Sequence, residues 1–288
     1  MMSNELTRRE LLKVASAVIP MSVLKRAEAV FEAELPSRGG EAMNVSGNFP
    51  AQAPELVREM VTVAHFDLKR VTELVGAHPA LAKAAWDWGF GDWETALGAA
   101  SHMGNRAMAE FLIEQGAHPT IFSAAMLGNL DTVKAMIAGA PGAQRIRGPH
   151  SISLLAHARM GGEAGKPVFE YLQGIEGADS DAPIPLSAED TATLVGTYGF
   201  GVGVTQQVEV DADLKMYAGS KMYTHAPQLN WTRKGTMTRP LFHLGGREFY
   251  PAGAPAVRVR FAEVADGVEM KVTDGGLVFS ALRPKPKT

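Results

Sequence analysis

The chain has no cysteine. Disulfide bonds, thiolate metal sites and a thiol nucleophile are therefore excluded, and so is a lipid anchor on cysteine. The charges nearly balance, at −3 for 288 residues, which gives no electrostatic case for binding nucleic acid. No apolar run approaches the roughly 18 residues that a membrane-spanning helix needs. The length of 288 residues predicts one to three domains, and the apolar share of 46% is ordinary for a globular protein.

The first 29 residues contain the succession of basic, apolar and small-residue regions that is typical of an export signal. The segment Thr7–Lys13, TRRELLK, is similar to the twin-arginine motif S/T-R-R-x-F-L-K, with leucine in place of phenylalanine. An apolar stretch, Val14–Leu24, follows, and Ala27–Ala29 forms an A-x-A cleavage pattern. The alternative is an amphipathic first helix, but Pro20 disfavours a long helix there. The resemblance implies a periplasmic or secreted protein.

A repeated pattern occupies the middle of the chain. The segments Ala96–Pro119 and Ser123–Pro141 align at an offset of 24 residues, which places Leu112 opposite Met136. Each segment predicts a short helix rich in alanine, a glycine turn, and a second helix with apolar residues at i, i+3 and i+4. Weaker copies of the second helix occur near Val71 and Val168. Such helix pairs cannot bury their apolar faces alone, so we expect them to stack.

The repeated segments resemble the ankyrin repeat. The third unit contains AAxxGNLxxVxxxI, and the second ends in LIEQGAHP, close to the family's LLxxGAxP. The family's TPLH-like opening is missing, and the 24-residue step is shorter than its usual repeat of about 33 residues. The resemblance implies an α-solenoid over residues 54–173 that binds a protein or peptide on its concave face.

An aromatic insert interrupts this pattern at residues 80–95. Three of the four tryptophans of the chain lie here, in the sequence AKAAWDWGFGDWE. We interpret the segment as a glycine-rich loop that either packs as a lid over the helices or is exposed as a binding patch. The candidate binding residues are Trp86, Trp88, Asp92, Trp93 and His102.

Several histidines and carboxylates lie near this insert. Asp92 and Glu94, with a nearby histidine, could do acid–base chemistry or hold a metal. The alternative for Asp92 is the N-cap of the next helix. The histidines show no H-E-x-x-H spacing, and we interpret them as hydrogen-bonded turn residues that need not converge; they are His65, His102, His118, His150 and His157. The sequence therefore assigns no catalytic residue, no metal ligand and no cofactor.

The last hundred residues change to an alternating pattern. Val257, Val259 and Phe261 face one side of a predicted strand, whereas Arg258 and Arg260 face the other. The arginine face predicts a solvated sheet surface, with an anion-binding patch as the alternative. Turn signals such as Asp-Gly separate the strands, which we expect to form an antiparallel sheet. The strands are expected at 194–198, 204–210, 249–253, 256–264 and 268–273.

This alternating region resembles the small β domain appended to many serine-β-lactamase-like hydrolases. The opening LVGTY and the closing segment FYPAGAPAVRVRF…DGVEMKV…GLVFSALR carry the likeness. The resemblance implies an accessory domain, and the S-x-x-K motif that performs the chemistry of those hydrolases is missing from the chain.

The expected fold class is α+β with two domains, an ankyrin-like α-solenoid followed by a small antiparallel sheet or half-barrel. We expect a monomeric, exported protein- or peptide-binding scaffold. One alternative is an enzyme or metal-binding protein with a site near Trp86–Glu94 and His102; the other is a small-ligand carrier that uses the β domain. Convergence of His, Asp and Glu within about 4 Å would favour the first alternative. The expected segments are an export signal at 1–29, a linker at 30–53, helical repeats at 54–173, a linker at 174–190 and a β domain at 191–288.

Overall fold

We describe the fold from a computed structural model, which covers residues 47–178, 184–200, 206–213, 223 and 228–286. The predicted export signal and most of the first linker lie outside these described residues. The described helices and strands belong to one compact unit, Asn48–Thr288. Within the described part of the chain, no helix combines the length and the apolar character needed to span a membrane.

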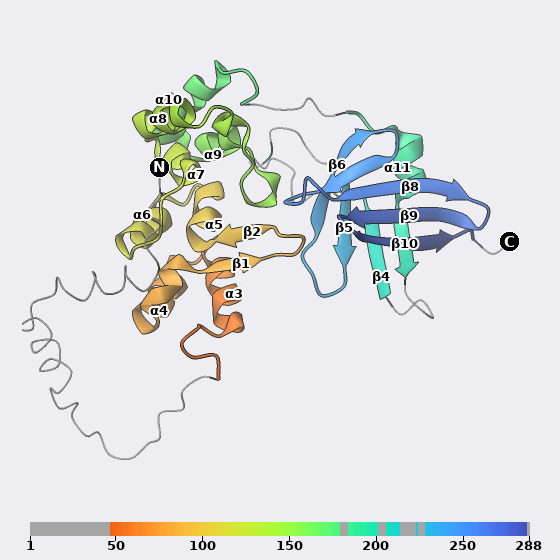
Figure 1. Ribbon diagram of the computed structural model, residues 1–288, viewed down its shortest axis with the longest axis horizontal. Coiled ribbons are helices and arrows are strands. Elements are labelled where there is room, and N and C mark those ends of the chain that lie inside the picture. Colours follow the sequence, from red (N-terminus) through yellow and green to blue (C-terminus); the bar gives the residue numbers. More distant parts are fainter. Residues whose placement is uncertain (1–46, 179–183, 201–205, 214–222, 224–227, 287–288) are drawn as a thin grey trace, which may run out of the picture. The chain divides into compact units, whose positions relative to one another are not determined.

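The first part of this unit is helical (Figure 1). Eight of the nine described α-helices form four pairs of sequential neighbours, each pair in contact and joined by a short turn, and three short 3-10 helices lie between other elements. The α-helices are α3 (Pro54–Val63), α4 (Leu68–Ala77), α5 (Ala96–His102), α6 (Arg106–Glu114), α7 (Ile121–Leu127), α8 (Leu130–Gly139), α9 (Leu154–Met160), α10 (Gly162–Gln173) and α11 (Ala188–Leu194), and the 3-10 helices are η1 (Pro79–Lys83), η2 (Ala143–Arg145) and η3 (Pro149–Ser151).

Side-chain caps fix where the short helices begin. Thr95 caps α5 by accepting a hydrogen bond from the backbone N–H of Gly98, and Ser153 caps α9 in the same way. Thr120 and Ser123 form a reciprocal capping box at the start of α7. Each cap satisfies a backbone donor that a helix start would otherwise leave without a partner. The prediction that Asp92 caps α5 was therefore wrong, because Thr95 holds that position.

The helical part does not form the ankyrin-like solenoid of the predicted fold class. A solenoid buries one continuous apolar core, whereas here one cluster lies mainly among α3 to α6 and another among α7 to α10. Polar side chains lie between α5 and α9, where the rings of His102 and His157 have centroids 6.4 Å apart. No solenoid is indicated among the described helices, because buried polar groups occupy positions where stacked repeats would share apolar ones.

The C-terminal part is a closed antiparallel barrel (Figure 1). Each strand pairs with its neighbours in sequence, and the last strand, β10, closes the barrel by pairing with β3 through Leu282 and Gly199. The strands are β3 (Gly196–Phe200), β4 (Gln206–Asp211), β5 (Leu229–Arg233), β6 (Arg239–Gly245), β7 (Glu248–Pro251), β8 (Arg258–Val264), β9 (Gly267–Asp274) and β10 (Leu277–Pro284).

The predicted half-barrel was wrong because three of the eight barrel strands were not predicted. These are β5, β6 and β10, and without them the sheet has too few strands to close. Strands β5 and β6 link β4 to β7, and β10 completes the ring by pairing with β9 and β3. The predicted linker at 174–190 also differs: residues 179–183 lie outside the described residues, and α11 begins within the linker at Ala188.

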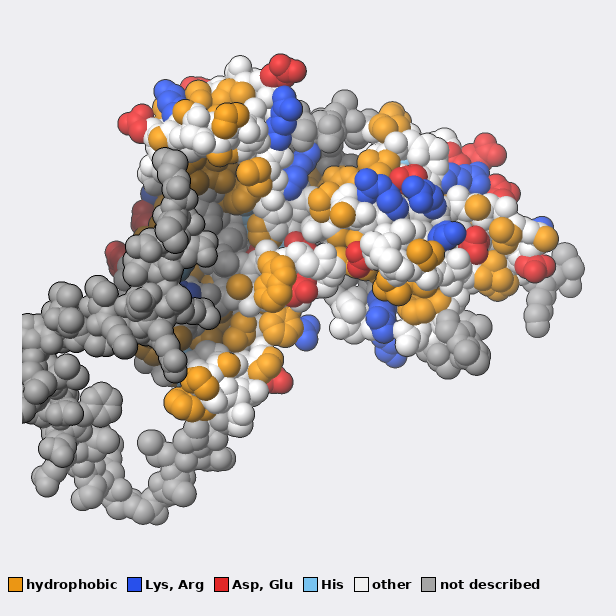
Figure 2. All heavy atoms as spheres, in the orientation of Figure 1, with side chains coloured by type: hydrophobic (Ala, Val, Ile, Leu, Met, Phe, Trp, Pro, Cys, Tyr) orange, Lys and Arg blue, Asp and Glu red, His pale blue; other side chains and the backbone are white. Residues whose placement is uncertain are grey.

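Side chains alternate along the strands, so that apolar residues lie inside the barrel and charged residues lie on its outer surface, as the sequence pattern predicted. Val259 and Phe261 are buried, whereas Arg258 and Arg260 both form ion pairs with Glu248 on the outside. Figure 2 shows basic and acidic side chains beside one another over this region. An eight-stranded barrel has room for its own side chains or one small ligand. Here large side chains, including Tyr198 and Phe249, occupy the described interior, which removes support for a ligand carrier.

We predict that Leu112→Ala lowers the free energy of unfolding by about 2–5 kcal/mol, the range for large-to-small changes in a core. Leu112 is fully buried in the first apolar cluster. Its counterpart Met136 is 41% exposed, so Met136→Ala should cost much less. Urea denaturation of both variants measures the difference. Equal costs would show that the burial of α6 has been assigned wrongly.

A second prediction concerns the turn at Gly128. Its φ is +81°, and a Cβ there would collide with the backbone carbonyl of Ala164. Gly116 also has a positive φ, +91°, but a Cβ there meets only the flexible end of Lys83. Gly116→Ala should therefore cost roughly 1–2 kcal/mol from backbone strain, and Gly128→Ala should cost roughly 1–3 kcal/mol more from overpacking. A Gly128→Ala variant as stable as Gly116→Ala would contradict this close contact of α10 with the turn.

Candidate metal centre

A short β-hairpin replaces the predicted glycine-rich loop. Strands β1 (Ala85–Asp87) and β2 (Trp93–Thr95) pair with Trp86 opposite Glu94. Gly89, Phe90 and Gly91 at the tip all have positive φ, which the two glycines tolerate readily. Along β2 the side chains alternate, so that Trp93 is 63% exposed while Glu94 is fully buried. The hairpin therefore directs one carboxylate inward.

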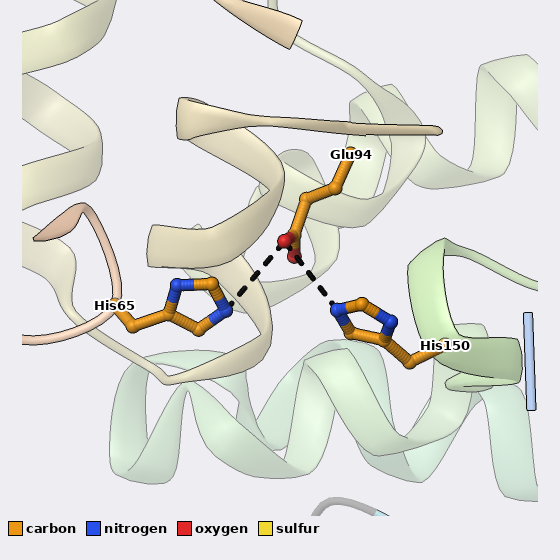
Figure 3. Close-up of side chains that lie close together, drawn as sticks. All are labelled: His65, Glu94 and His150. Carbon is orange, nitrogen blue, oxygen red and sulfur yellow. Dashed lines mark ion pairs between the residues drawn. The ribbon is translucent and has the colours of Figure 1, made fainter. Parts of the chain in front are cut away.

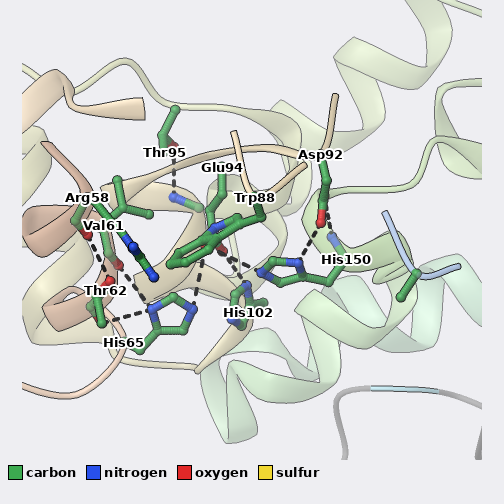
Figure 4. Close-up of polar contacts among 12 residues, drawn as sticks. Arg58, Val61, Thr62, His65, Trp88, Asp92, Glu94, Thr95, His102 and His150 are labelled. Atoms are coloured by element: carbon green, nitrogen blue, oxygen red, sulfur yellow. Dashed lines mark hydrogen bonds and ion pairs between the residues drawn. The ribbon is translucent and has the colours of Figure 1, made fainter. Parts of the chain in front are cut away.

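The carboxylate of Glu94 is the centre of a polar cluster (Figure 4). Its Oε2 accepts a hydrogen bond from the indole N–H of Trp88 at 2.7 Å. The Nε2 atoms of His150 and His65 lie 3.4 and 3.6 Å from the same Oε2. On the other side, Nδ1 of His102 lies 3.2 Å from Oε1. Oε1 itself is buried and makes no hydrogen bond among the described residues.

The end of α3 orients His65. Its Nδ1 lies 3.0 Å from the carbonyl oxygens of both Val61 and Thr62. A carbonyl oxygen only accepts hydrogen bonds, so Nδ1 carries the ring proton as donor. In the neutral ring, the lone pair of Nε2 then points toward Glu94. This side chain is 22% exposed, which makes it the most accessible of the three histidines that face Glu94.

The 3-10 helix η3 orients His150. The residue has a positive φ of 58°, and its backbone N–H donates to Oδ1 of Asp92 at 2.9 Å. Its Nδ1 lies 2.8 Å from Oδ2 of the same carboxylate. The carboxylate thereby fixes both the backbone and the ring, and leaves Nε2 facing Glu94.

Two further histidines surround the cluster. His102 ends α5 and lies between His65 and His150, with ring centroids 4.9 and 5.6 Å away. His157 in α9 uses Nδ1 to donate to the carbonyl of Ser153 at 2.8 Å. Its Nε2 is buried and makes no hydrogen bond within the described part of the chain. Three of the eight histidines therefore face the carboxylate of Glu94, and His157 contacts one of them, His102.

An arginine from the barrel completes the site. Arg239 of β6 is buried, and its Nη1 donates to Oδ2 of Asp92 at 3.0 Å and to the carbonyl of Ala252 at 2.6 Å. Its Nη2 donates to the carbonyls of Trp88 and Gly89 at 2.6 and 3.0 Å. The guanidinium thus holds both the hairpin tip and the carboxylate that orients His150.

These contacts set the charges of the two carboxylates. Burial alone would raise the pKa of Asp92 and of Glu94, because a low-dielectric surrounding disfavours the ion. Hydrogen bonds and charge from His150 outweigh burial for Asp92, with help from Arg239, and lower its pKa. The nearby rings of His102 and His150 likewise outweigh burial for Glu94 and lower its pKa. Both groups are carboxylates at neutral pH.

The histidines divide into two kinds. Burial disfavours the charged ring of His150, but Asp92 and Glu94 outweigh it and raise the pKa of His150 to about 9. Burial dominates at His157 and lowers its pKa to about 3, and it also lowers the pKa of His102. His102 and His157 are therefore neutral at pH 7, and their nitrogens are free of a second proton.

Three of these residues have the geometry of a metal site (Figure 3). Ligand atoms of His65, Glu94 and His150 all lie within 4.8 Å of one another. Zinc–nitrogen bonds of about 2.0–2.1 Å with tetrahedral angles place two ligand atoms ~3.4 Å apart. The separations of 3.4 and 3.6 Å between each histidine Nε2 and Glu94 Oε2 match this value.

The outer contacts of the histidines also fit metal binding. Metal-binding histidines donate the other ring N–H to a carboxylate or a backbone carbonyl, which fixes the tautomer and the ring orientation. His150 does so with Asp92 and His65 with Val61 and Thr62. In neutral rings, both Nε2 lone pairs would face a carboxylate oxygen. Protons or one cation must lie between them.

Three of the five predicted binding residues belong to this site. Trp88, Asp92 and His102 all contact its members. Trp86 is half-buried against the first apolar cluster. Trp93 is exposed on the opposite face of β2 from Glu94. The predicted loop therefore supplies the site, but two of its tryptophans lie outside it.

The site residues that come from distant segments were not predicted from the sequence. His65 and His150 were interpreted as turn histidines, and Arg239 lay in a strand that was not predicted. Asp92 and Glu94, which the sequence singled out as a possible acid–base or metal-binding pair, do lie on the segment that forms the site. No local spacing connects them to a histidine 58 residues away or to an arginine 147 residues away.

No protein-family model, no curated protein and no solved structure matches this chain.

The charge of His150 predicts how stability depends on pH when a chelator keeps metals away. Its folded pKa of about 9 lies above the ordinary value of 6.5. The stabilisation is therefore complete below about pH 6.5 and is lost as pH rises through 9, with a total on the order of 3 kcal/mol. Thermal unfolding between pH 6.5 and 9.5 should show this fall, and His150→Gln should lack it. An equal fall in both proteins would refute the assignment.

Proposed function

We propose that this protein binds a divalent transition-metal ion of the zinc class at His65, Glu94 and His150, and that the ion stabilises the fold. The observation that carries the proposal is the direction of the two histidine rings. Each Nδ1 is held by an acceptor, and each Nε2 is directed at one buried carboxylate oxygen.

The donor set favours this class of ion. Imidazole nitrogens suit zinc, copper, iron and nickel, whereas magnesium and calcium prefer sites made of oxygen alone. Two nitrogens and one carboxylate are also the protein ligands of some zinc sites, in which a water takes the fourth position. The carboxylate of Glu94 would offset part of the charge of the ion, and its buried Oε1 lacks a hydrogen bond in the described structure.

The position of the ligands supports a stabilising role. His65 follows α3, Glu94 lies on the hairpin, and His150 lies on η3, so one ion would join three segments that are far apart in sequence. An ion that binds only the folded state raises stability by mass action.

The peptide-binding role expected from a solenoid has lost its structural basis, because no solenoid is indicated among the described helices. Export by a twin-arginine route stays a prediction.

Metal titration of chelator-treated protein tests the proposal. We expect one equivalent of Zn²⁺ or Co²⁺ to bind, and an excess of about 100 times the dissociation constant to add ~2.7 kcal/mol of stability. For a chain of this size, that corresponds to a rise in Tm of roughly 5–10 °C. Calorimetry and elemental analysis of the purified protein give the stoichiometry.

Paired histidine variants make the test specific. His65→Gln should abolish the metal-dependent rise in Tm, since it removes one of three ligands. His78→Gln is the matched control, because His78 is an exposed residue that ends α4 and lies outside the cluster. A wild-type protein that binds no first-row divalent ion, or a His65→Gln variant that binds as the wild type does, would refute the proposal.

A further inference from the structure

The barrel contributes no metal ligand, yet it contacts both segments that carry buried ligands. At the hairpin tip, Phe90 packs on Trp231 of β5 with ring centroids 5.4 Å apart. Beside His150, the hydroxyl of Ser151 accepts a hydrogen bond from the backbone N–H of Gly253 at 2.8 Å. The segments that hold Glu94 and His150 are therefore both attached to the barrel.

A continuous chain of polar contacts runs from the barrel to a ligand nitrogen. Arg239 Nη1 lies 3.0 Å from Asp92 Oδ2, and the same oxygen lies 2.8 Å from His150 Nδ1. The Nε2 atom of that ring faces Glu94. All four residues are buried. Water therefore has little access to replace any of these contacts.

Arg239 also limits how Asp92 can move. Its two terminal nitrogens make four hydrogen bonds, one to Asp92 and three to backbone carbonyls. Two of those carbonyls belong to Trp88 and Gly89, next to the hairpin tip that leads into Asp92. The planar guanidinium fixes these groups together, which a flexible ammonium could not do in the same geometry.

We propose that Arg239 is a positioning residue of the metal centre: by holding Asp92, it fixes the ring of His150, so that docking of the barrel sets the metal affinity. This inference rests on the proposed function. It adds that a residue of the barrel positions a ligand of the same site and so affects its metal affinity, although the barrel supplies no ligand itself.

If Arg239 acts mainly through its charge, its loss should change the metal affinity in the opposite direction from the loss of a residue that acts by positioning a ligand. Removing a cation from the neighbourhood of a divalent ion should strengthen binding if the charge of Arg239 were its main effect. Loss of a residue that orients a ligand typically weakens metal affinity by about 10–100-fold. We therefore expect Arg239→Gln to weaken Co²⁺ and Zn²⁺ binding by about 10-fold or more. The visible absorption spectrum of bound Co²⁺ should also change, because the ring of His150 is no longer fixed.

The matched control is Arg283→Gln. Arg283 is another barrel arginine that donates to a backbone carbonyl, that of Thr193, and packs over Tyr198. Its loss should destabilise the barrel while leaving metal affinity and the Co²⁺ spectrum unchanged. Asp92→Asn should match the loss in Arg239→Gln, and the double variant should lose little more, since both act through one chain of contacts.

The experiment is Co²⁺ titration of the full chain, followed by absorption and calorimetry. Weaker binding with a changed spectrum in Arg239→Gln, but not in Arg283→Gln, supports the inference. Unchanged or tighter binding in Arg239→Gln overturns it while leaving the metal site intact, and so does equal weakening in both variants. A wild-type protein that binds no metal removes the proposed function itself and this inference with it. Should Arg239→Gln fail to fold, Arg239→Lys is measured in its place with the same outcomes.

Discussion

The buried carboxylate of Glu94 is the constraint to which the rest of the structure responds. A carboxylate removed from water is very costly unless hydrogen bonds and opposite charge surround it. Here an indole N–H and three histidine rings lie around it, and each of those histidines comes from a different element. Polar groups therefore occupy the junction of α3, α5 and η3, where a repeat protein would place apolar residues.

The second buried carboxylate extends this constraint to the barrel. Asp92 accepts from the backbone and ring of His150 and from the guanidinium of Arg239. Because only Trp93 lies between Asp92 and Glu94 along the chain, the hairpin cannot move one carboxylate without moving the other. The helical part and the barrel are consequently joined through charged groups that neither part could bury by itself.

Buried pairs of this kind are weak evidence for stability alone, because desolvation can exceed the attraction. They are better understood as a means of specifying one geometry. The Nδ1 atoms of His65 and His150 are each held by an acceptor, and both Nε2 atoms lie near one carboxylate oxygen. The same geometry would also suit a cation, as in the metal site proposed above.

The sequence by itself determined part of the local structure. Alternating residues placed Val259 and Phe261 inside the barrel and Arg258 outside, and the glycine turn at Gly128 was visible in its pattern. Tertiary structure alone decided the barrel closure, since one pairing between β10 and β3 has no local signal. It also decided the site. Histidines at 65, 102 and 150 follow no common spacing, and only the packing of α3, α5 and η3 around the hairpin brings their side chains to Glu94.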